Sequence, residues 1–344
     1  MKILVTGGTG YIGSHTVVEL QQNDFEVVII DNLCNSTIEV LDGIEAITGI
    51  RPEFEQIDLT EADKVNDFFM RHQNLVAVIH FAALKAVGES VTKPLEYYRN
   101  NLNSLINVLA SMREFQVKNL VFSSSCTVYG QADILPVTEK TPRKQAESPY
   151  GNTKAMCEDI MRDIAKVTTE MNLLALRYFN PIGAHPSALI GELPNGVPNN
   201  LIPFLTQTVA GIREQLSVFG DDYNTPDGSA VRDYIDVVDL AKAHVIAIRR
   251  LLNGKNKKNY EYFNIGTGNG LSVLELIKAF EKATQKKVNY KITARRVGDI
   301  EKVWADTTLA NNELGWKAQI PIEETLANTW RWQQNLDKGH KIKK

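Results

Sequence analysis

A chain of 344 residues with a net charge of −3 is long enough to bury a sizeable core, and it offers no basic surface of the kind that nucleic-acid binding requires. Its N-terminal apolar run ends at Thr6, too early for a signal peptide, and no later segment approaches the length that spans a bilayer. Three cysteines without paired spacing favour reduced thiols, and six histidines without ligand spacing favour no metal site. We therefore expect a cytoplasmic protein that binds neither nucleic acid nor membrane.

The first fifteen residues predict a strand, a tight glycine turn and the start of a helix. Residues 2–6 are apolar and suit a strand buried on both faces. Gly7, Gly10 and Gly13 follow with a spacing typical of dinucleotide enzymes. Positions without a Cβ let backbone N–H groups and a helix N-terminus face a pyrophosphate. A glycine turn of this kind can also be purely structural, so the elements that follow it are needed to distinguish a dinucleotide site from a structural turn.

A carboxylate after the second predicted strand narrows the choice of dinucleotide. Residues 25–30 are apolar, and Asp31 follows them about twenty residues past the glycines, where a carboxylate can bind the 2′-hydroxyl of an adenosine ribose. Residues 32–36 contain no basic side chain that would accept a 2′-phosphate. The pattern therefore predicts NAD rather than NADP.

Further strands at 54–57, 76–80 and 120–125 alternate with helical segments, which predicts a Rossmann-type doubly wound parallel sheet of the α/β class. Asp58, after the third strand, either accepts a hydrogen bond from the adenine amino group or caps a helix. His80 reads as a core histidine, and the small residues that follow it allow a backbone to approach the cofactor. Asn100, on a predicted helix over 94–114, is either half exposed or bonded to a ligand.

The fifth strand ends in a run of hydroxyl side chains, and a tyrosine–lysine pair follows it in the chain. Tyr150 and Lys154 are four residues apart at the start of a helix predicted to reach about residue 166, so they share one face. We expect the ammonium, together with the positive nicotinamide of oxidised NAD, to lower the pKa of the phenol. Combined with the glycine turn and Ser125, the pair indicates a catalytic site.

The order of the glycine turn, Asp31, Ser125 and the tyrosine–lysine pair resembles the extended short-chain dehydrogenase/reductase family. Residues 84–98, 176–186, 198–201 and 231–235 resemble in particular its members that invert C4 of UDP-hexoses, and the match runs from residue 2 to 332. The resemblance and the glycine turn together assign cofactor contacts to Gly7, Gly10, Tyr11, Ile12, Gly13, Asp31, Asn32, Leu33, Cys34, Asn35, Ser36, Asp58, Leu59, Phe81, Ala82, Ala83, Leu84, Lys85, Asn100, Ser125, Tyr150, Lys154 and Phe179.

After Phe179 the strand–helix alternation breaks, and Gly, Pro and Asn become frequent through Asn200. We expect an NAD-binding domain over residues 1–180, rejoined by a strand near 260–265, and a smaller α/β lobe over 181–344 with helices at 272–283 and 322–332. By resemblance, the nucleotide sugar contacts Lys85, Ser125, Tyr150, Asn180, Asn200, Leu201, Ser217, Phe219, Arg232, Arg296, Asp299 and Val303. The two arginines suit phosphate oxygens, although either can instead serve a structural ion pair.

The resemblance implies an isomerase that interconverts UDP-glucose and UDP-galactose, with Tyr150 as the base, Ser125 hydrogen-bonded to the same oxygen and Lys154 tuning the tyrosine. A nucleotide-sugar 4,6-dehydratase is the nearest rival, but such enzymes carry Asp-Glu where this chain has Cys126 and Thr127. A non-catalytic dinucleotide sensor is a second rival, and sensors typically lose the tyrosine–lysine pair.

Two finer expectations also come from the resemblance. Members of the family form homodimers through the helices that correspond here to residues 94–114 and 149–166. A tyrosine at the position of Val303 accompanies restriction to UDP-glucose and UDP-galactose, whereas smaller residues accompany use of N-acetylated sugars. Val303 should therefore open volume near C2 of the sugar, unless neighbouring side chains fill that space.

Overall fold

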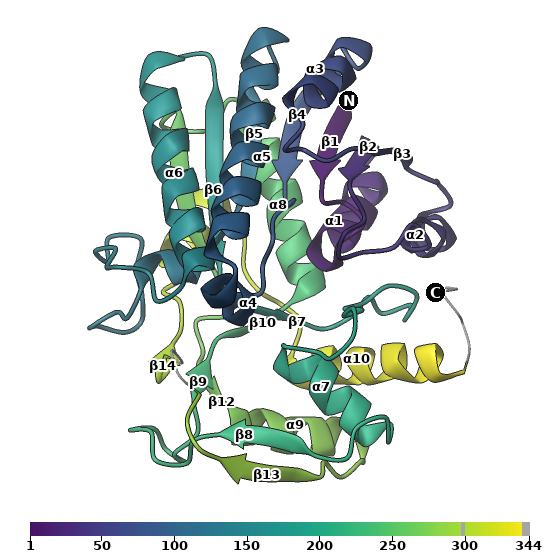
Figure 1. Ribbon diagram of the computed structural model, residues 1–344, viewed down its shortest axis with the longest axis vertical. Helices are drawn as coiled ribbons and strands as arrows, with labels where there is room; N and C mark the ends of the chain where they lie inside the picture. Colours follow the sequence, from purple (N-terminus) through teal and green to yellow (C-terminus); the bar gives the residue numbers. More distant parts are fainter. Residues whose placement is uncertain (297–299, 339–344) are drawn as a thin grey trace.

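The computed structural model describes residues 1–296 and 300–338, and a seven-stranded parallel sheet forms its upper half (Figure 1). The strands run in the order β11-β6-β5-β4-β1-β2-β3, so the order reverses between β1 and β4. The fold prediction is confirmed, including the return of a strand near residue 260, whereas β6 was not predicted. The strands are β1 (Lys2–Thr6), β2 (Glu26–Asp31), β3 (Glu53–Gln56), β4 (Leu75–His80), β5 (Asn119–Ser125), β6 (Asn172–Tyr178) and β11 (Tyr260–Ile265).

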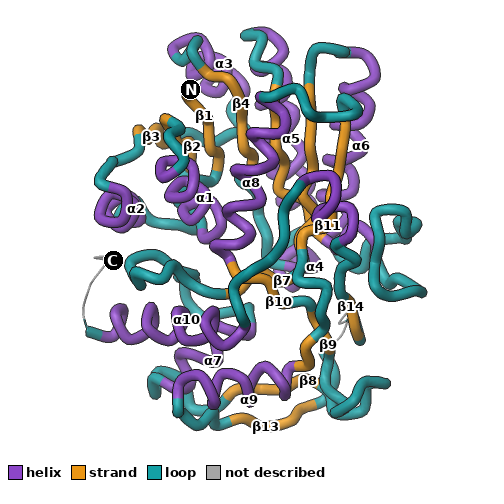
Figure 2. The backbone as a smooth tube through the Cα atoms, turned by 180° about the vertical axis from the view of Figure 1, so that it is seen from behind, coloured by secondary structure: helices purple, strands orange, loops and turns teal. Residues whose placement is uncertain are grey.

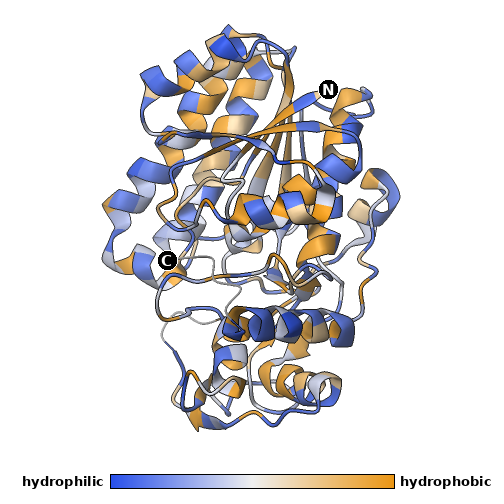
Figure 3. Cartoon of the chain, turned by 90° about the vertical axis from the view of Figure 1, so that its right-hand side faces the viewer, coloured by the Kyte–Doolittle hydropathy of each residue, from blue (hydrophilic) through white to orange (hydrophobic). Residues whose placement is uncertain are grey.

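Helices cover both faces of this sheet because its strands are apolar on both sides. Ile3 and Val5 pack into the core beneath α1 (Tyr11–Gln22), α2 (Val40–Thr48) and α8 (Val237–Leu252). Leu4 points to the opposite core, beneath α3 (Ala62–Arg71), α5 (Pro94–Glu114) and α6 (Pro149–Val167). The hydrophobic strands lie between more polar outer helices (Figure 3). His80 is buried against the Thr6 hydroxyl, 2.8 Å from its Nδ1, as expected for a core histidine.

The second lobe lies below the sheet in both the front and the rear view (Figures 1 and 2). Its core includes Leu205, Phe280 and Leu326, one from each of three helices. The pair β7–β10 connects the two parts of the molecule, after which α8 returns to the sheet. The lobe elements are β7 (Asn180–Ile182), α7 (Leu201–Val209), β8 (Leu216–Phe219), β9 (Val231–Arg232), β10 (Tyr234–Asp236), β12 (Leu271–Ser272), α9 (Val273–Thr284), β13 (Tyr290–Thr293), β14 (Lys302–Val303) and α10 (Ile322–Asp337).

The described residues also include three short helices: α4 (Val87–Thr92), a 3₁₀ turn over Cys126–Tyr129 and a π turn over Ala310–Leu314. Across residues 1–296 and 300–338, no helix combines the length and apolar character needed to cross a membrane. The three cysteines are free thiols, as the sequence predicted.

Candidate active site

A cavity of about 650 Å³ opens at the carboxyl ends of the strands, beside the reversal of strand order. Doubly wound sheets bind their ligands at this position. The wall combines the loops after β1, β2, β3 and β4 with residues 189–200 of the second lobe and Trp332 of α10. The cavity therefore has one side built by the sheet and another built by the lobe.

The glycine turn leaves no room for side chains at two of its positions. Gly7 has a φ of +70°, and a Cβ there would lie 2.7 Å from the backbone nitrogen of Ala82. A Cβ on Gly13 would lie 2.2 Å from the Gly7 carbonyl oxygen, so α1 packs as closely as predicted. Gly10 supplies no side-chain cap to α1, and the first helical turn contains no acidic residue. The free helix N-terminus therefore suits a pyrophosphate.

Two carboxylates stand where ribose and adenine donors are expected. Asp31 is buried, and its Oδ1 accepts a hydrogen bond from the Ser36 hydroxyl at 3.3 Å. Asp58 accepts hydrogen bonds from Thr60 through Oδ1 and from the Asn32 amide through Oδ2 at 3.0 Å. Burial alone would raise the pKa of Asp58, but these hydrogen bonds bring the pKa below its ordinary value. Both residues line the cavity.

The loop after β4 is fixed by an asparagine that the sequence analysis missed. Asn101 is buried on α5, accepts a hydrogen bond from the Leu84 amide at 2.8 Å and donates one to the Leu84 carbonyl at 3.0 Å. Asn100 is half-buried, donates to Asn101 at 3.0 Å and lines the cavity. A single asparagine on an amphipathic helix gives no sequence signal that separates a loop anchor from a surface residue.

Helix α6 carries the tyrosine–lysine pair to the end of β5. The Ser148 side chain caps the helix by accepting from the Gly151 amide at 3.1 Å. Lys154 is 3% exposed, and its ammonium donates to the Ser123 carbonyl at 2.7 Å. The ammonium also lies 5.9 Å from the centre of the Tyr150 ring. The pair therefore shares one face of the helix, as its spacing predicted.

Burial shifts the pKa values of both side chains in this pair. Burial raises the pKa of Tyr150 well above its ordinary value, nearby Cys126 adds to this, and a hydrogen bond with Ser125 opposes it. Burial lowers the pKa of Lys154 to about 8. The Lys154 ammonium is directed at the Ser123 carbonyl oxygen, and burial of the phenol is the largest cause of the raised pKa of Tyr150. A tyrosinate near neutral pH therefore requires a further positive charge beside Tyr150.

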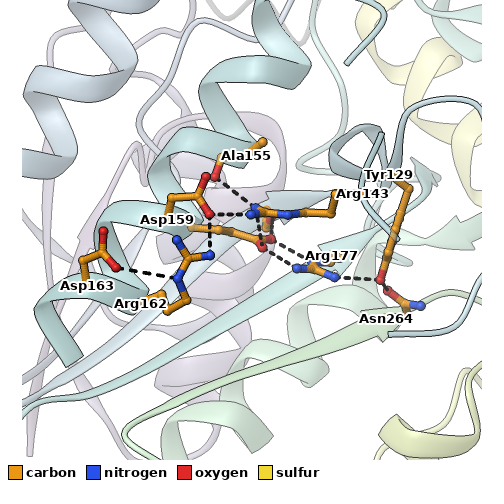
Figure 4. A network of polar contacts seen from close by, with 10 residues as sticks. Tyr129, Arg143, Ala155, Asp159, Arg162, Asp163, Arg177 and Asn264 are labelled. Atoms are coloured by element: carbon orange, nitrogen blue, oxygen red, sulfur yellow. Dashed lines mark hydrogen bonds and ion pairs between the residues drawn. The ribbon is translucent and has the colours of Figure 1, made fainter. Parts of the chain in front are cut away.

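A buried ion pair behind the catalytic helix links three strands to it. Glu158 of α6 pairs with Arg177 of β6 and accepts a hydrogen bond from the Ser124 hydroxyl of β5 at 2.5 Å. Arg177 also donates to the Tyr129 hydroxyl at 2.8 Å, which donates to Asn264 of β11 at 2.7 Å (Figure 4). These bonds fix the catalytic helix against the strand end that carries Ser125.

Most of the predicted cofactor residues meet at the cavity. Those lining it are Gly7, Gly10, Tyr11, Ile12, Gly13, Asp31, Asn32, Cys34, Asn35, Ser36, Asp58, Leu59, Phe81, Ala82, Ala83, Leu84, Lys85, Asn100, Tyr150 and Lys154. Leu33, Ser125 and Phe179 do not form part of this lining among the described residues. Ser125 and Phe179 are buried behind it.

The predicted sugar-nucleotide residues are more dispersed. Lys85, Tyr150 and Asn200 line the cavity. The Arg296 guanidinium lies 5.6 Å from the centre of the Phe219 ring at the end of β8. Arg232 of β9 stands opposite Val303 of β14. The others lie in β7 (Asn180), at the start of α7 (Leu201) and in β8 (Ser217), whereas Asp299 lies outside the described residues.

Arg232 nevertheless reaches the catalytic strand end. Burial raises the pKa of the Cys126 thiol to about 12, and the charge of Arg232 opposes this shift. Since Cys126 follows Ser125 directly, the guanidinium belongs to the surroundings of the predicted catalytic hydroxyl. This places one lobe residue near the predicted catalytic residues at the end of β5.

The segment 189–200 contributes much more of the cavity wall than its sequence predicted. Ten of its residues line the cavity, namely Leu189, Ile190, Gly191, Glu192, Leu193, Pro194, Asn195, Val197, Asn199 and Asn200. Its Gly-, Pro- and Asn-rich composition was interpreted as a domain boundary, with only Asn200 assigned to the substrate. Trp332, which the sequence placed on an amphipathic helix, reaches the same wall.

Known proteins resemble this chain over its whole length. A family model described as GDP-mannose 4,6 dehydratase matches residues 4–329. A UDP-glucose 4-epimerase of Bacillus subtilis (strain 168) is 51% identical over 341 residues, covering 99% of both chains. A UDP-glucose 4-epimerase of Mus musculus is 49% identical, covering 98% of both.

Solved structures agree with these sequence relatives. UDP-glucose-4-epimerase from Stenotrophomonas maltophila, with bound NAD and formylated UDP-arabinopyranose, superposes with a TM-score of 0.94 at 47% identity and covers 98% of this chain and 99% of that one. UDP-glucose 4-epimerase from Bifidobacterium longum, in complex with NAD⁺ and UDP, also gives 0.94, at 45% identity and with 98% and 100% coverage. The chain therefore belongs to the UDP-glucose 4-epimerase family of extended short-chain dehydrogenases/reductases.

Proposed function

We propose that the chain is an NAD-dependent isomerase that inverts C4 of UDP-hexoses and interconverts UDP-glucose and UDP-galactose through a transient 4-keto sugar. The observation that carries the proposal is that Tyr150 and Lys154 line the same cavity as the glycine turn and Asp31, while Ser125 lies beside Tyr150 outside that lining. Relatives of known structure hold NAD together with UDP or a UDP-sugar.

The cofactor is NAD, and the residues present fit it. Any side chain at Gly7 or Gly13 would fill the space of the turn, α1 offers an uncapped N-terminus, and Asp31 lies where a ribose hydroxyl is expected. When bound, oxidised NAD supplies a positive charge and a hydride acceptor, and the hydride returns to the other face of the sugar. The cofactor is therefore regenerated in each turnover.

The chain's own residues manage the proton and the orientation of the sugar. Tyr150 takes the 4-hydroxyl proton and later returns it, with Ser125 hydrogen-bonded beside it. Lys154, held by the Ser123 carbonyl, contributes positive charge next to the phenol. Arg232 and Arg296 are suited to the diphosphate, and Phe219 to the face of the base.

One assay separates this function from its two rivals. Purified protein supplied with UDP-galactose should form UDP-glucose, and the reverse, without net change in NAD. A 4,6-dehydratase would release a 4-keto-6-deoxy sugar instead, and a sensor would bind NAD without turnover. Cys126 and Thr127 support the epimerase, because neither supplies the acid and base that elimination of water requires.

We also propose a homodimer formed through α5 and α6. Exposed apolar side chains lie on these helices and on the adjoining α4: Leu95 and Ile106 on α5, Met156 on α6, and Val87 and Val91 on α4. Apolar surface of this kind is typical of a protein–protein interface. Light scattering at micromolar concentration should give twice the mass of one chain, and a monomeric mass would contradict the proposal.

The side chain of Val303 bears on the range of UDP-sugars that the protein accepts. Val303 is 6% exposed and packs with Val128, Tyr129 and Val137. We propose that its small side chain extends the range to UDP-N-acetylglucosamine and UDP-N-acetylgalactosamine.

We further propose that residues 1–180 chiefly bind NAD and 181–344 chiefly bind the UDP-sugar. The free thiols support the predicted cytoplasmic location.

A further inference from the structure

Glu192 binds two predicted substrate contacts from opposite sides of the cavity. Its Oε1 accepts a hydrogen bond from the Asn200 amide at 2.6 Å and lies 3.7 Å from the Lys85 ammonium. Asn200 immediately precedes α7 of the second lobe, whereas Lys85 follows β4 of the sheet. One carboxylate oxygen therefore joins the lobe side of the cavity wall to the sheet side.

The backbone of Glu192 is anchored from behind. Trp332 donates its indole N–H to the Glu192 carbonyl at 3.1 Å. A Cβ on Gly191 would lie 2.6 Å from the Trp332 ring, so the segment lies directly against α10. The Glu192 side chain is 13% exposed, whereas the Lys85 side chain is 54% exposed. An anchored carboxylate thus restrains a solvent-exposed ammonium.

We infer that Glu192 is a positioning residue for the nucleotide sugar. It holds Asn200 and Lys85 in the orientation that receives the ligand, and it does not touch the reacting atoms. Holding the two side chains in place before binding removes part of the entropy cost of ordering them when the ligand arrives. The inference rests on the proposed function, because it takes UDP-hexose as the ligand of these two residues.

The test compares KM with kcat. Glu192→Ala removes both contacts and should raise KM for UDP-galactose about tenfold, with kcat within about threefold of wild type. This result is expected because the variant weakens binding of the substrate and of the transition state equally. Glu192→Gln keeps an acceptor for Asn200 but loses the charge facing Lys85, so KM should rise about threefold. Glu45→Ala is the matched control, because Glu45 on α2 also pairs with a cation, Arg51 at 2.8 Å, outside the cavity lining.

A double variant tests whether Glu192 acts through its partner. In an Asn200→Ala background, Glu192→Ala should raise KM by clearly less than in the wild-type background, because one of its two contacts is already gone. Independent, multiplicative effects would overturn the inference. The far-ultraviolet circular dichroism spectrum should match wild type in every variant, which shows that each variant folds.

The remaining outcomes are distinguishable. A wild-type protein that does not interconvert the two UDP-sugars refutes the proposed function. With active wild type, a KM for Glu192→Ala within twofold of wild type, or a lower kcat at unchanged KM, overturns the positioning role. If the alanine variant does not fold, the near-isosteric glutamine variant decides by the same criterion: an unchanged KM overturns the inference.

Discussion

The sheet side and the lobe side of the cavity are built in different ways. On the sheet side, cofactor residues are consecutive in sequence and follow the ends of parallel strands, as in the loop 81–85 after β4. On the lobe side, the wall comes from the irregular segment 189–200, which leads into α7, and from a tryptophan of α10. Strand ends share one edge by geometry, whereas an irregular wall depends on long-range packing. Local sequence therefore describes the first side far better than the second.

The largest expected effect comes from removing the proposed base, Tyr150. Tyr150→Phe keeps the ring but deletes the proton acceptor, so kcat for UDP-galactose should fall by at least about a hundredfold, the usual scale of general-base loss. NAD content and UDP binding should be unchanged, because both sides of the cavity remain built. Steady-state kinetics and isothermal titration with UDP check this result, and near-normal turnover would contradict the assignment.

The second largest effect concerns the dependence of folding stability on pH, which follows from buried histidines. Burial lowers the pKa of His15 and His80 to about 3 and of His244 to about 4. In the unfolded chain these histidines bind protons as the pH falls below 6.5, whereas in the folded chain they remain neutral over this range. The free energy of unfolding therefore falls as the pH falls through 6.5. Asp236, whose pKa burial raises to about 6, acts in the opposite direction over the same range.

The net loss between pH 7 and pH 6 should be roughly 2 kcal/mol. Urea midpoints measured by circular dichroism at the two pH values provide the check. The variant His15→Gln, which removes one titrating group from α1, should flatten the dependence. A midpoint that rises on acidification would show that other groups dominate.

A smaller effect distinguishes two hydroxyls at the end of β5. Ser125 hydrogen-bonds Tyr150, whereas the buried Thr127 hydroxyl has no hydrogen-bond partner in the structure. Ser125→Ala should lower kcat by about tenfold, and Thr127→Ala by less than about threefold, because only the first removes a contact with the base. The reverse order in parallel assays would assign the catalytic role to the wrong hydroxyl.

The smallest expected effect concerns substrate range, which tests the role of Val303 on the lobe side. Wild type should convert both the plain and the N-acetylated UDP-sugar pairs, and Val303→Tyr should lower the kcat/KM ratio for the N-acetylated pair about tenfold or less, since pocket volume discriminates weakly. The tight packing of Val303 against Tyr129 makes retained folding the necessary control. Wild type that ignores the N-acetylated pair, or equal use by the tyrosine variant, would refute the volume argument.

Sequence patterns predicted the sheet, the glycine turn and the tyrosine–lysine helix because each depends on local spacing. Gly13 is a clear case, since the need for a glycine there follows from the close packing of α1, which the structure shows. The Arg177–Glu158 pair was not predicted, because the positions of one arginine and one glutamate in the sequence do not indicate that a strand and a helix will place them in contact. Strand β6 and helix α8 were also not predicted.

The amino-acid sequence by itself determined the fold class, the preference for NAD and the family, because glycines, strand-end carboxylates and long motifs carry their meaning within a few residues. Only the tertiary structure showed that the phenol of Tyr150 is buried, which raises its pKa. It also decided that Glu192 lies between Lys85 and Asn200. Burial and contacts between distant segments arise only when the whole chain packs, so no local pattern records them.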